Sequence, residues 1–157
     1  MALVIFGIGN PSRGDDALGP LLMAELAGQT LPGVTLVDDF QLQVEHALDL
    51  EGQDLALFID AGTGTPAPFC FREIFPVTDR FGSSHALAPE AVLAVHRDIS
   101  PTPPPPAFVL CICGETFELG APLSETARTH LAAARRFLGQ RLAHIDAGDW
   151  RATFQPE

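Results

Sequence analysis

The chain has 157 residues, a length that fits one domain, and its hydrophobic fraction of 46% is enough to fill a core. Nine Lys and Arg stand against 20 Asp and Glu, which gives a formal net charge of −11. This charge argues against nucleic acid and anionic membranes as main partners. No apolar run approaches the roughly 20 residues that span a bilayer. Three cysteines are too few for a disulfide framework, so we expect reduced thiols in a cytoplasmic protein.

In the first half of the chain, apolar runs alternate with turn-rich or amphipathic segments. Residues 2–6 form a short apolar run without a basic leader, which predicts a strand buried on both faces rather than a signal peptide. A loop rich in glycine follows at 7–14, and the next helix should start near 17–19 because Pro20 is tolerated only in a first turn. The expected apolar stripe of that helix is Leu18, Leu21, Leu22 and Leu26. The elements expected next are a strand at 34–37, a short helix at 44–50 and a buried strand at 55–59.

The second half continues the alternation. Residues 69–75 suit a strand near an edge, and residues 89–95 suit a helix with Pro89 in its first turn. The segment 101–106 should be an extended polyproline connector, and 108–113 another buried strand. Ser124 can cap a long last helix, and the expected buried stripe of that helix is Ala127, Leu131, Ala134, Leu138 and Leu142.

This order of elements predicts one α/β domain over residues 1–145, without internal repeats. We expect a three-layer α/β/α sandwich around a mainly parallel, twisted sheet of about five strands. A tail at 146–157 follows. It is polar apart from Trp150 and Phe154, and it either frays or docks those two aromatic side chains on the domain.

Three candidate site residues fall where the predicted strands end. Asp16 follows the first strand across the glycine loop, Asp60 ends the third strand, and His85 precedes the Pro89 helix. Ligands of open α/β sheets bind outside the carboxyl ends of the strands. Two carboxylates and an imidazole can hold a divalent transition metal and leave positions open. The alternatives are an acid at a helix N-terminus for Asp16, a local turn acceptor for Asp60 and a surface loop residue for His85.

Other residues offer weaker candidates. His46, next to Glu45, is an alternative ligand, although a helical surface pair is the favoured interpretation. Cys111 and Cys113 would point to one face of a strand, where core residues are more common than ligands. The Gly7-x-Gly9 pair, with Asp38 at the end of the second strand, suggests a dinucleotide site. The third glycine of that motif is missing, because Ser12 occupies its position.

The segment Gly7-Ile8-Gly9-Asn10-Pro11-Ser12-Arg13-Gly14-Asp15-Asp16-Ala17-Leu18-Gly19 resembles the opening of the hydrogenase maturation endopeptidases. The similarity continues in Ile59-Asp60-Ala61, Ser84-His85-Ala86-Leu87 and Cys113-Gly114-Glu115, and spans roughly residues 1–142. The first motif is fairly specific, and the others are specific mainly by their order and spacing. Some family members have Glu at the position of Asp16, which changes reach by one methylene but keeps the ligand type.

The resemblance implies an α/β/α sandwich, usually a monomer, with a metal site made by Asp16, Asp60 and His85. Members of the family remove a C-terminal extension from the large-subunit precursor of a nickel–iron hydrogenase after nickel insertion. The nickel is implied to come with the precursor and to be the recognition element. Asp16 and Asp60 are the expected catalytic residues. Either the metal assists the reaction, or the two carboxylates share a water as in an aspartic-type peptidase.

Two other functions remain open at this point. The Gly-Asn-Pro loop is also similar to that of peptidyl-tRNA hydrolases, but those enzymes need a histidine soon after the loop and a basic face. Here the first histidine is His46 and the net charge is −11. The second alternative is a non-catalytic, nickel-dependent checkpoint or chaperone module that binds the same precursor without cutting it.

Overall fold

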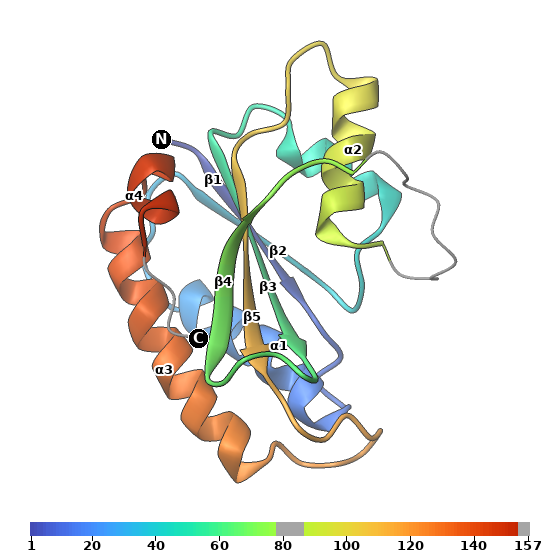
Figure 1. Cartoon of the computed structure of the whole chain (residues 1–157), viewed down its shortest axis with the longest axis vertical. Coiled ribbons are helices and arrows are strands. Elements are labelled where there is room, and N and C mark those ends of the chain that lie inside the picture. The colour runs from blue at the N-terminus through green and yellow to red at the C-terminus, as the bar shows by residue number, and fades with distance from the viewer. Residues whose placement is uncertain (78–86, 154–157) are drawn as a thin grey trace.

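The computed structural model describes residues 1–77 and 87–153, which form a five-stranded sheet flanked by helices (Figure 1). The strands are β1 (Leu3–Ile8), β2 (Val34–Asp39), β3 (Leu55–Gly62), β4 (Phe69–Ile74) and β5 (Ala107–Cys113). Their order in the sheet is β2-β1-β3-β5-β4. All neighbouring pairs are parallel except β4 and β5, which are antiparallel. The prediction of a mainly parallel sheet with the 69–75 segment at an edge is therefore confirmed.

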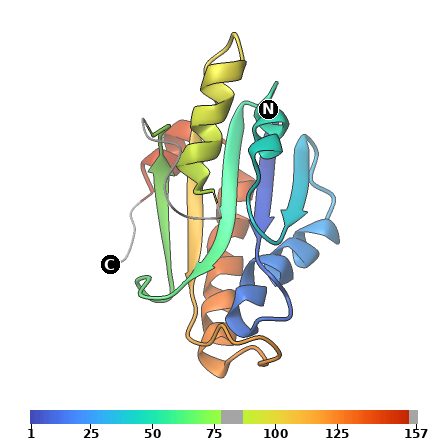
Figure 2. The same cartoon turned by 90° about the vertical axis from the view of Figure 1, so that its right-hand side faces the viewer.

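Helices cover both faces of the sheet, which confirms the three-layer prediction (Figures 1 and 2). One face packs against α1 (Leu18–Ala27), α3 (Glu125–Ala143) and the short α4 (Ala147–Arg151). The other face packs against the 3₁₀ helix η2 (Val44–Leu50) and α2 (Pro89–Ile99). None of the helices in the described segments is long and apolar enough to cross a bilayer.

The central strands are buried on both faces because each alternates its apolar side chains between two cores. In β1, Leu3 and Ile5 join the core under α1 and α3, whereas Val4 and Phe6 join the core under η2 and α2. Phe6 stacks on Phe58 of β3 with the ring centroids 4.7 Å apart. This two-sided burial explains why the sequence shows continuous apolar runs rather than alternation.

Several elements differ from the prediction at their ends. The strand β1 extends to Ile8, and β3 extends to Gly62 because β5 pairs with it that far, so Asp60 lies inside a strand rather than at its end. The 44–50 helix is a 3₁₀ helix, and α2 continues to Ile99. The prediction that Leu21 joins the buried stripe is wrong: its side chain is 40% exposed, while Leu18, Leu22 and Leu26 face the sheet.

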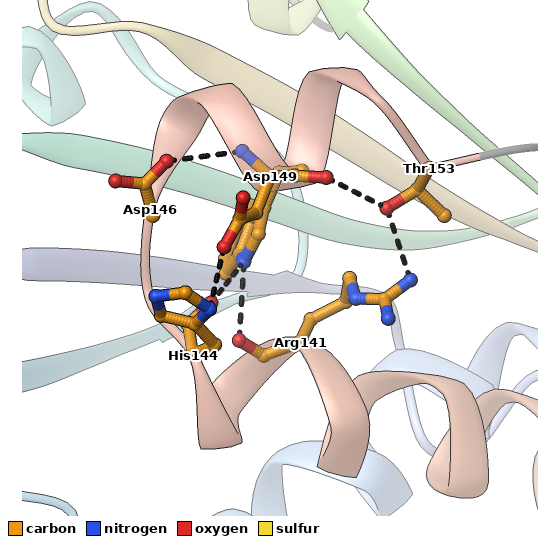
Figure 3. Close-up of polar contacts among 6 residues, drawn as sticks. Arg141, His144, Asp146, Asp149 and Thr153 are labelled. Carbon is orange, nitrogen blue, oxygen red and sulfur yellow. Dashed lines mark hydrogen bonds and ion pairs between the residues drawn. The ribbon is translucent and has the colours of Figure 1, made fainter.

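The segment after α3 docks on the domain through Trp150, which is only 1% exposed. Figure 3 shows the polar contacts of neighbouring residues, among them Arg141, His144 and Asp146. The indole N–H donates to the backbone carbonyls of Arg141 and His144, each at 3.1 Å. Asp146 caps α4 by accepting a hydrogen bond from the Asp149 N–H at 3.0 Å. Around the indole, the ring of Phe108 lies 5.5 Å away, centroid to centroid. Phe154 lies outside the described residues.

We expect Trp150→Ala to lower the free energy of unfolding by about 3–5 kcal/mol, because it leaves a large cavity between α3 and the sheet. Trp150→Phe keeps most of the ring but leaves two carbonyls without their donor, and should cost about 1–2 kcal/mol. Urea-induced unfolding measures both values. Leu119→Ala is the control, because Leu119 is 75% exposed and its removal should change little. An unchanged free energy for Trp150→Ala would show that the tail does not contribute to the core.

Candidate active site at the carboxyl edge of the sheet

Asp16 is held beside the end of β1 by two glycines. It lies in the 3₁₀ helix η1 (Gly14–Ala17), directly before α1. Gly9 has φ of +149°, and a Cβ there would lie 2.1 Å from the Asp16 carbonyl oxygen. A Cβ on Gly19 would lie 2.5 Å from the Ile8 carbonyl oxygen. The absence of both side chains therefore lets the η1–α1 turn sit on the strand end, where Asp16 Oδ2 accepts the Asn10 N–H at 2.7 Å.

The neighbouring acid, Asp15, points into the protein instead and is fully buried. Its carboxylate accepts hydrogen bonds from Glu115 N–H at 2.7 Å, Thr116 N–H at 3.2 Å, and both the N–H and the hydroxyl of Ser124 at 2.8 Å. Burial by itself raises the pKa of Asp15, but these hydrogen bonds outweigh it and hold the pKa below its usual value. Asp15 thus ties the 114–124 loop to the site, a structural role that the sequence analysis did not identify.

Asp60 lies near the carboxyl end of β3, at the same edge of the sheet. Its Oδ1 accepts the Ala61 N–H at 2.7 Å. Its pKa is raised to about 6, chiefly by burial and also by the negative charge of Asp16, while the hydrogen bond from the Ala61 N–H opposes the rise. The structure therefore brings Asp16 and Asp60 close enough for one charge to act on the other. Among the described residues, neither Oδ1 of Asp16 nor Oδ2 of Asp60 accepts a hydrogen bond, so each carboxylate has an oxygen available.

The third predicted ligand, His85, lies outside the described residues 1–77 and 87–153. Within those two segments, no three His, Cys, Asp or Glu side chains are arranged to hold a metal ion. The described part of the site therefore supplies two carboxylates, and the metal-ligand role of Asp16, Asp60 and His85 stays a prediction.

Asp16 lines one of two adjoining cavities. One has a volume of about 450 Å³ and the other about 520 Å³, and Phe40 lines both. Volumes in this range accommodate small ligands or several side chains of an extended peptide. The first is lined by Asn10, Arg13, Asp16, Phe40, Gln41 and Phe117. The second is lined by Gly7, Gly9, Pro11, Pro20, Asp38, Asp39 and Phe40.

Solved protein structures share this architecture, although curated sequences do not match the chain. No protein-family model matches the chain, and no curated protein sequence matches it. Solved structures do match. The maturation protease HycI from Thermococcus kodakarensis KOD1 has a TM-score of 0.69 at 21% identity, covering 91% of this chain and 93% of that one. The maturating endopeptidase HybD from E. coli has a TM-score of 0.71 at 19% identity, with the same coverage. An endopeptidase from Escherichia coli solved in solution has a TM-score of 0.68 at 20% identity, covering 93% and 96%.

The chain has the fold of the hydrogenase maturation proteases. The shared architecture extends over about nine-tenths of both chains in each comparison. The fold predicted from the sequence resemblance is thereby confirmed.

Within this maturation protease fold, the two glycines that suggested a dinucleotide site have packing roles. A Cβ on Gly7 would lie 2.0 Å from Cγ of Met23, so Gly7 lets α1 pack closely on β1. Gly9 makes room for the Asp16 carbonyl, as described above. Because both glycines are required by contacts within the chain, neither indicates a bound pyrophosphate. Asp38 lines the larger cavity, and burial raises its pKa.

The expectation for His46 is wrong, because it is not a surface residue of a helical pair. Its side chain is buried at the start of η2, and Nδ1 accepts the Gln43 N–H at 2.7 Å. The proton of a neutral ring then sits on Nε2, which lies 3.3 Å from Asp39 Oδ2. The ring also contacts the Phe6 ring edge-on, with the two ring centroids 5.8 Å apart. His46 thus links η2 to the end of β2, on either side of Phe40 and Gln41, which line the cavities.

Proposed function

We propose that this protein is an endopeptidase that removes the C-terminal extension of the nickel-loaded large-subunit precursor of a nickel–iron hydrogenase. The observation that carries the proposal is the pair of carboxylates, Asp16 and Asp60, coupled at the carboxyl edge of a maturation protease fold. The HycI and HybD structures with this fold are hydrogenase maturation proteases. On this proposal the enzyme works as a monomer in the cytoplasm, and it acts on neither nucleic acid nor membranes.

In the proposed reaction, the nickel belongs to the substrate. Asp16, Asp60 and His85 would receive it, since carboxylate and imidazole donors suit a divalent transition metal. A metal placed there can polarise the scissile carbonyl or a bound water. Specificity for the loaded precursor then follows, because an empty precursor lacks the group that docks it.

In the aspartic-type alternative, in which no metal is bound to the carboxylates, Asp60 is the better placed of the two to act as a general base. A pKa of about 6 lets it take a proton from water near neutral pH with more driving force than an ordinary aspartate has. The hydroxide formed in this way attacks the scissile carbonyl carbon, and the proton passes to the leaving amine as the peptide bond breaks. Asp16, anchored by the Asn10 N–H, would orient the same water.

The decisive experiment incubates the purified protein with nickel-loaded precursor and follows the precursor's mass. We expect loss of the C-terminal extension, and no cleavage of a nickel-free precursor. Binding without loss of mass would favour the checkpoint or chaperone alternative. Cleavage of the nickel-free precursor at the same rate would contradict the recognition step.

A further inference from the structure

Two cysteines face each other across the edge of the sheet. Cys70 of β4 and Cys111 of β5 are direct partners in the antiparallel register. The Cα atoms of such partners are about 4.5–5.5 Å apart, and their side chains point to the same face. Disulfides join residues whose Cα atoms are about 4.4–6.8 Å apart. In this structure no disulfide joins any of the three cysteines.

The ladder next to this pair defines its geometry. The Cys113 N–H donates to the Pro68 carbonyl at 3.1 Å, so these two residues form a hydrogen-bonded pair. Because hydrogen-bonded and non-hydrogen-bonded pairs alternate, Cys70 and Cys111 also form a hydrogen-bonded pair, with Cα atoms about 5.5 Å apart. A bridge needs the Cβ atoms to approach by about 1 Å. The strand β4 can supply that movement because, within residues 1–77 and 87–153, it pairs with β5 alone, at the edge of the sheet.

The pair lies next to the proposed catalytic centre. On its other side, Cys111 is the register partner of Asp60 in the parallel pairing of β3 and β5. The Cys111 sulfur lies 3.3 Å from the Thr65 hydroxyl, and a Cβ on Gly62 would lie 2.8 Å from it. The sulfur therefore supports the end of β3 and the 63–65 loop, which follow Asp60. A bridge to Cys70 would draw the sulfur away from this loop.

We propose that Cys70 and Cys111 form a reversible disulfide that couples the protein's thiol–disulfide state to the site at Asp60. The co-reactant is a low-molecular-weight disulfide such as oxidised glutathione. One thiolate attacks a sulfur of that disulfide and releases one thiol. The second cysteine then attacks the mixed disulfide and releases the second thiol, so two protein thiols are oxidised while one external disulfide is reduced to two thiols.

The first test does not depend on any enzymatic activity. Wild-type protein is treated with oxidised glutathione, and its mass and peptide map are determined. We expect a product lighter by two hydrogen atoms, with Cys70 linked to Cys111 and the thiol of Cys113 still reactive. Cys113 is the internal control, because it has Pro68 rather than a cysteine opposite it. A stable glutathione adduct, or a bridge that includes Cys113, would overturn the proposal.

The second test asks whether the bridge acts on the site, and this part rests on the proposed function. Oxidised wild-type protein should lose most of its precursor cleavage and regain it with dithiothreitol. Cys70→Ser should keep its activity under the same oxidant, whereas Cys113→Ser should respond like wild type. A bridge that forms without any change in cleavage would refute the coupling to Asp60. If no variant cleaves precursor under reducing conditions, the proposed function fails while the disulfide result stands.

Discussion

Replacing Asp60 by Asn should abolish precursor cleavage and make the protein more stable at pH 7. Removing a general base or metal-binding carboxylate lowers the cleavage rate by at least about 100-fold. The stability gain arises because the fold holds Asp60 at a pKa of about 6, so ionising it at neutral pH costs free energy that a neutral amide avoids. With partial exposure taken into account, we expect a gain of up to about 2 kcal/mol.

The effect of Asp60 on stability should depend on pH, and the two pKa values give the direction of that dependence. The pKa of Asp60 is about 6 in the folded protein and about 3.9 in the unfolded chain. Between these values the folded protein binds more protons, so the contribution of Asp60 to stability falls as the pH rises from about 4 to about 6. The difference between Asp60→Asn and wild type should therefore be full at pH 7 and fall to about a fifth of that value at pH 4. Urea-induced unfolding at both pH values measures it.

The matched control is Asp49→Asn, because Asp49 is exposed on η2. It should change the unfolding free energy by less than about 0.5 kcal/mol at either pH. An Asp60→Asn variant that is less stable than wild type at pH 7 would mean that Asp60 is a structural acceptor rather than a strained site residue.

Asp15→Ala should lower the free energy of unfolding by about 3 kcal/mol or more. It leaves the backbone N–H groups of Glu115, Thr116 and Ser124, and the Ser124 hydroxyl, without their acceptor. Because the pKa of Asp15 is lowered in the fold, its contribution is present at neutral pH and is lost as the pH falls through the folded-state value. Urea-induced unfolding at pH 7 measures the loss.

Asp16→Ala is the control for this experiment, since it removes the adjacent acid. Asp16 accepts one backbone N–H, from Asn10, so we expect a cost of about 1 kcal/mol together with the loss of cleavage. The two neighbours should thus separate, with Asp15 needed for stability and Asp16 for activity. Equal loss of stability in both variants would contradict this division.

The sequence was sufficient to predict the layers and the strand directions. Buried apolar runs separated by helices favour parallel strands, and all four parallel strands were found within a few residues of their predicted bounds. The ends of strands depend on pairing instead. The extension of β3 past Asp60 comes from its register with β5, about 50 residues away, and no local pattern contains that information.

For the site, the prediction that Asp16 and Asp60 share one edge rested on the rule that parallel strands end together. The different roles of the adjacent acids Asp15 and Asp16 could not be predicted in the same way. Asp15 is identified as structural only through partners 100 to 109 residues along the chain. The burial of His46 depends on Phe6 and Asp39, which a helical periodicity does not include.

The central claim is that Asp16, Asp60 and His85 meet at one nickel-binding point. A crystal structure of the protein soaked with Ni²⁺ tests it most directly. We predict one ion bound by an oxygen of Asp16, an oxygen of Asp60 and a ring nitrogen of His85, at distances of about 2.0–2.2 Å. An ion bound elsewhere, with these three side chains too far apart to share it, would contradict the claim.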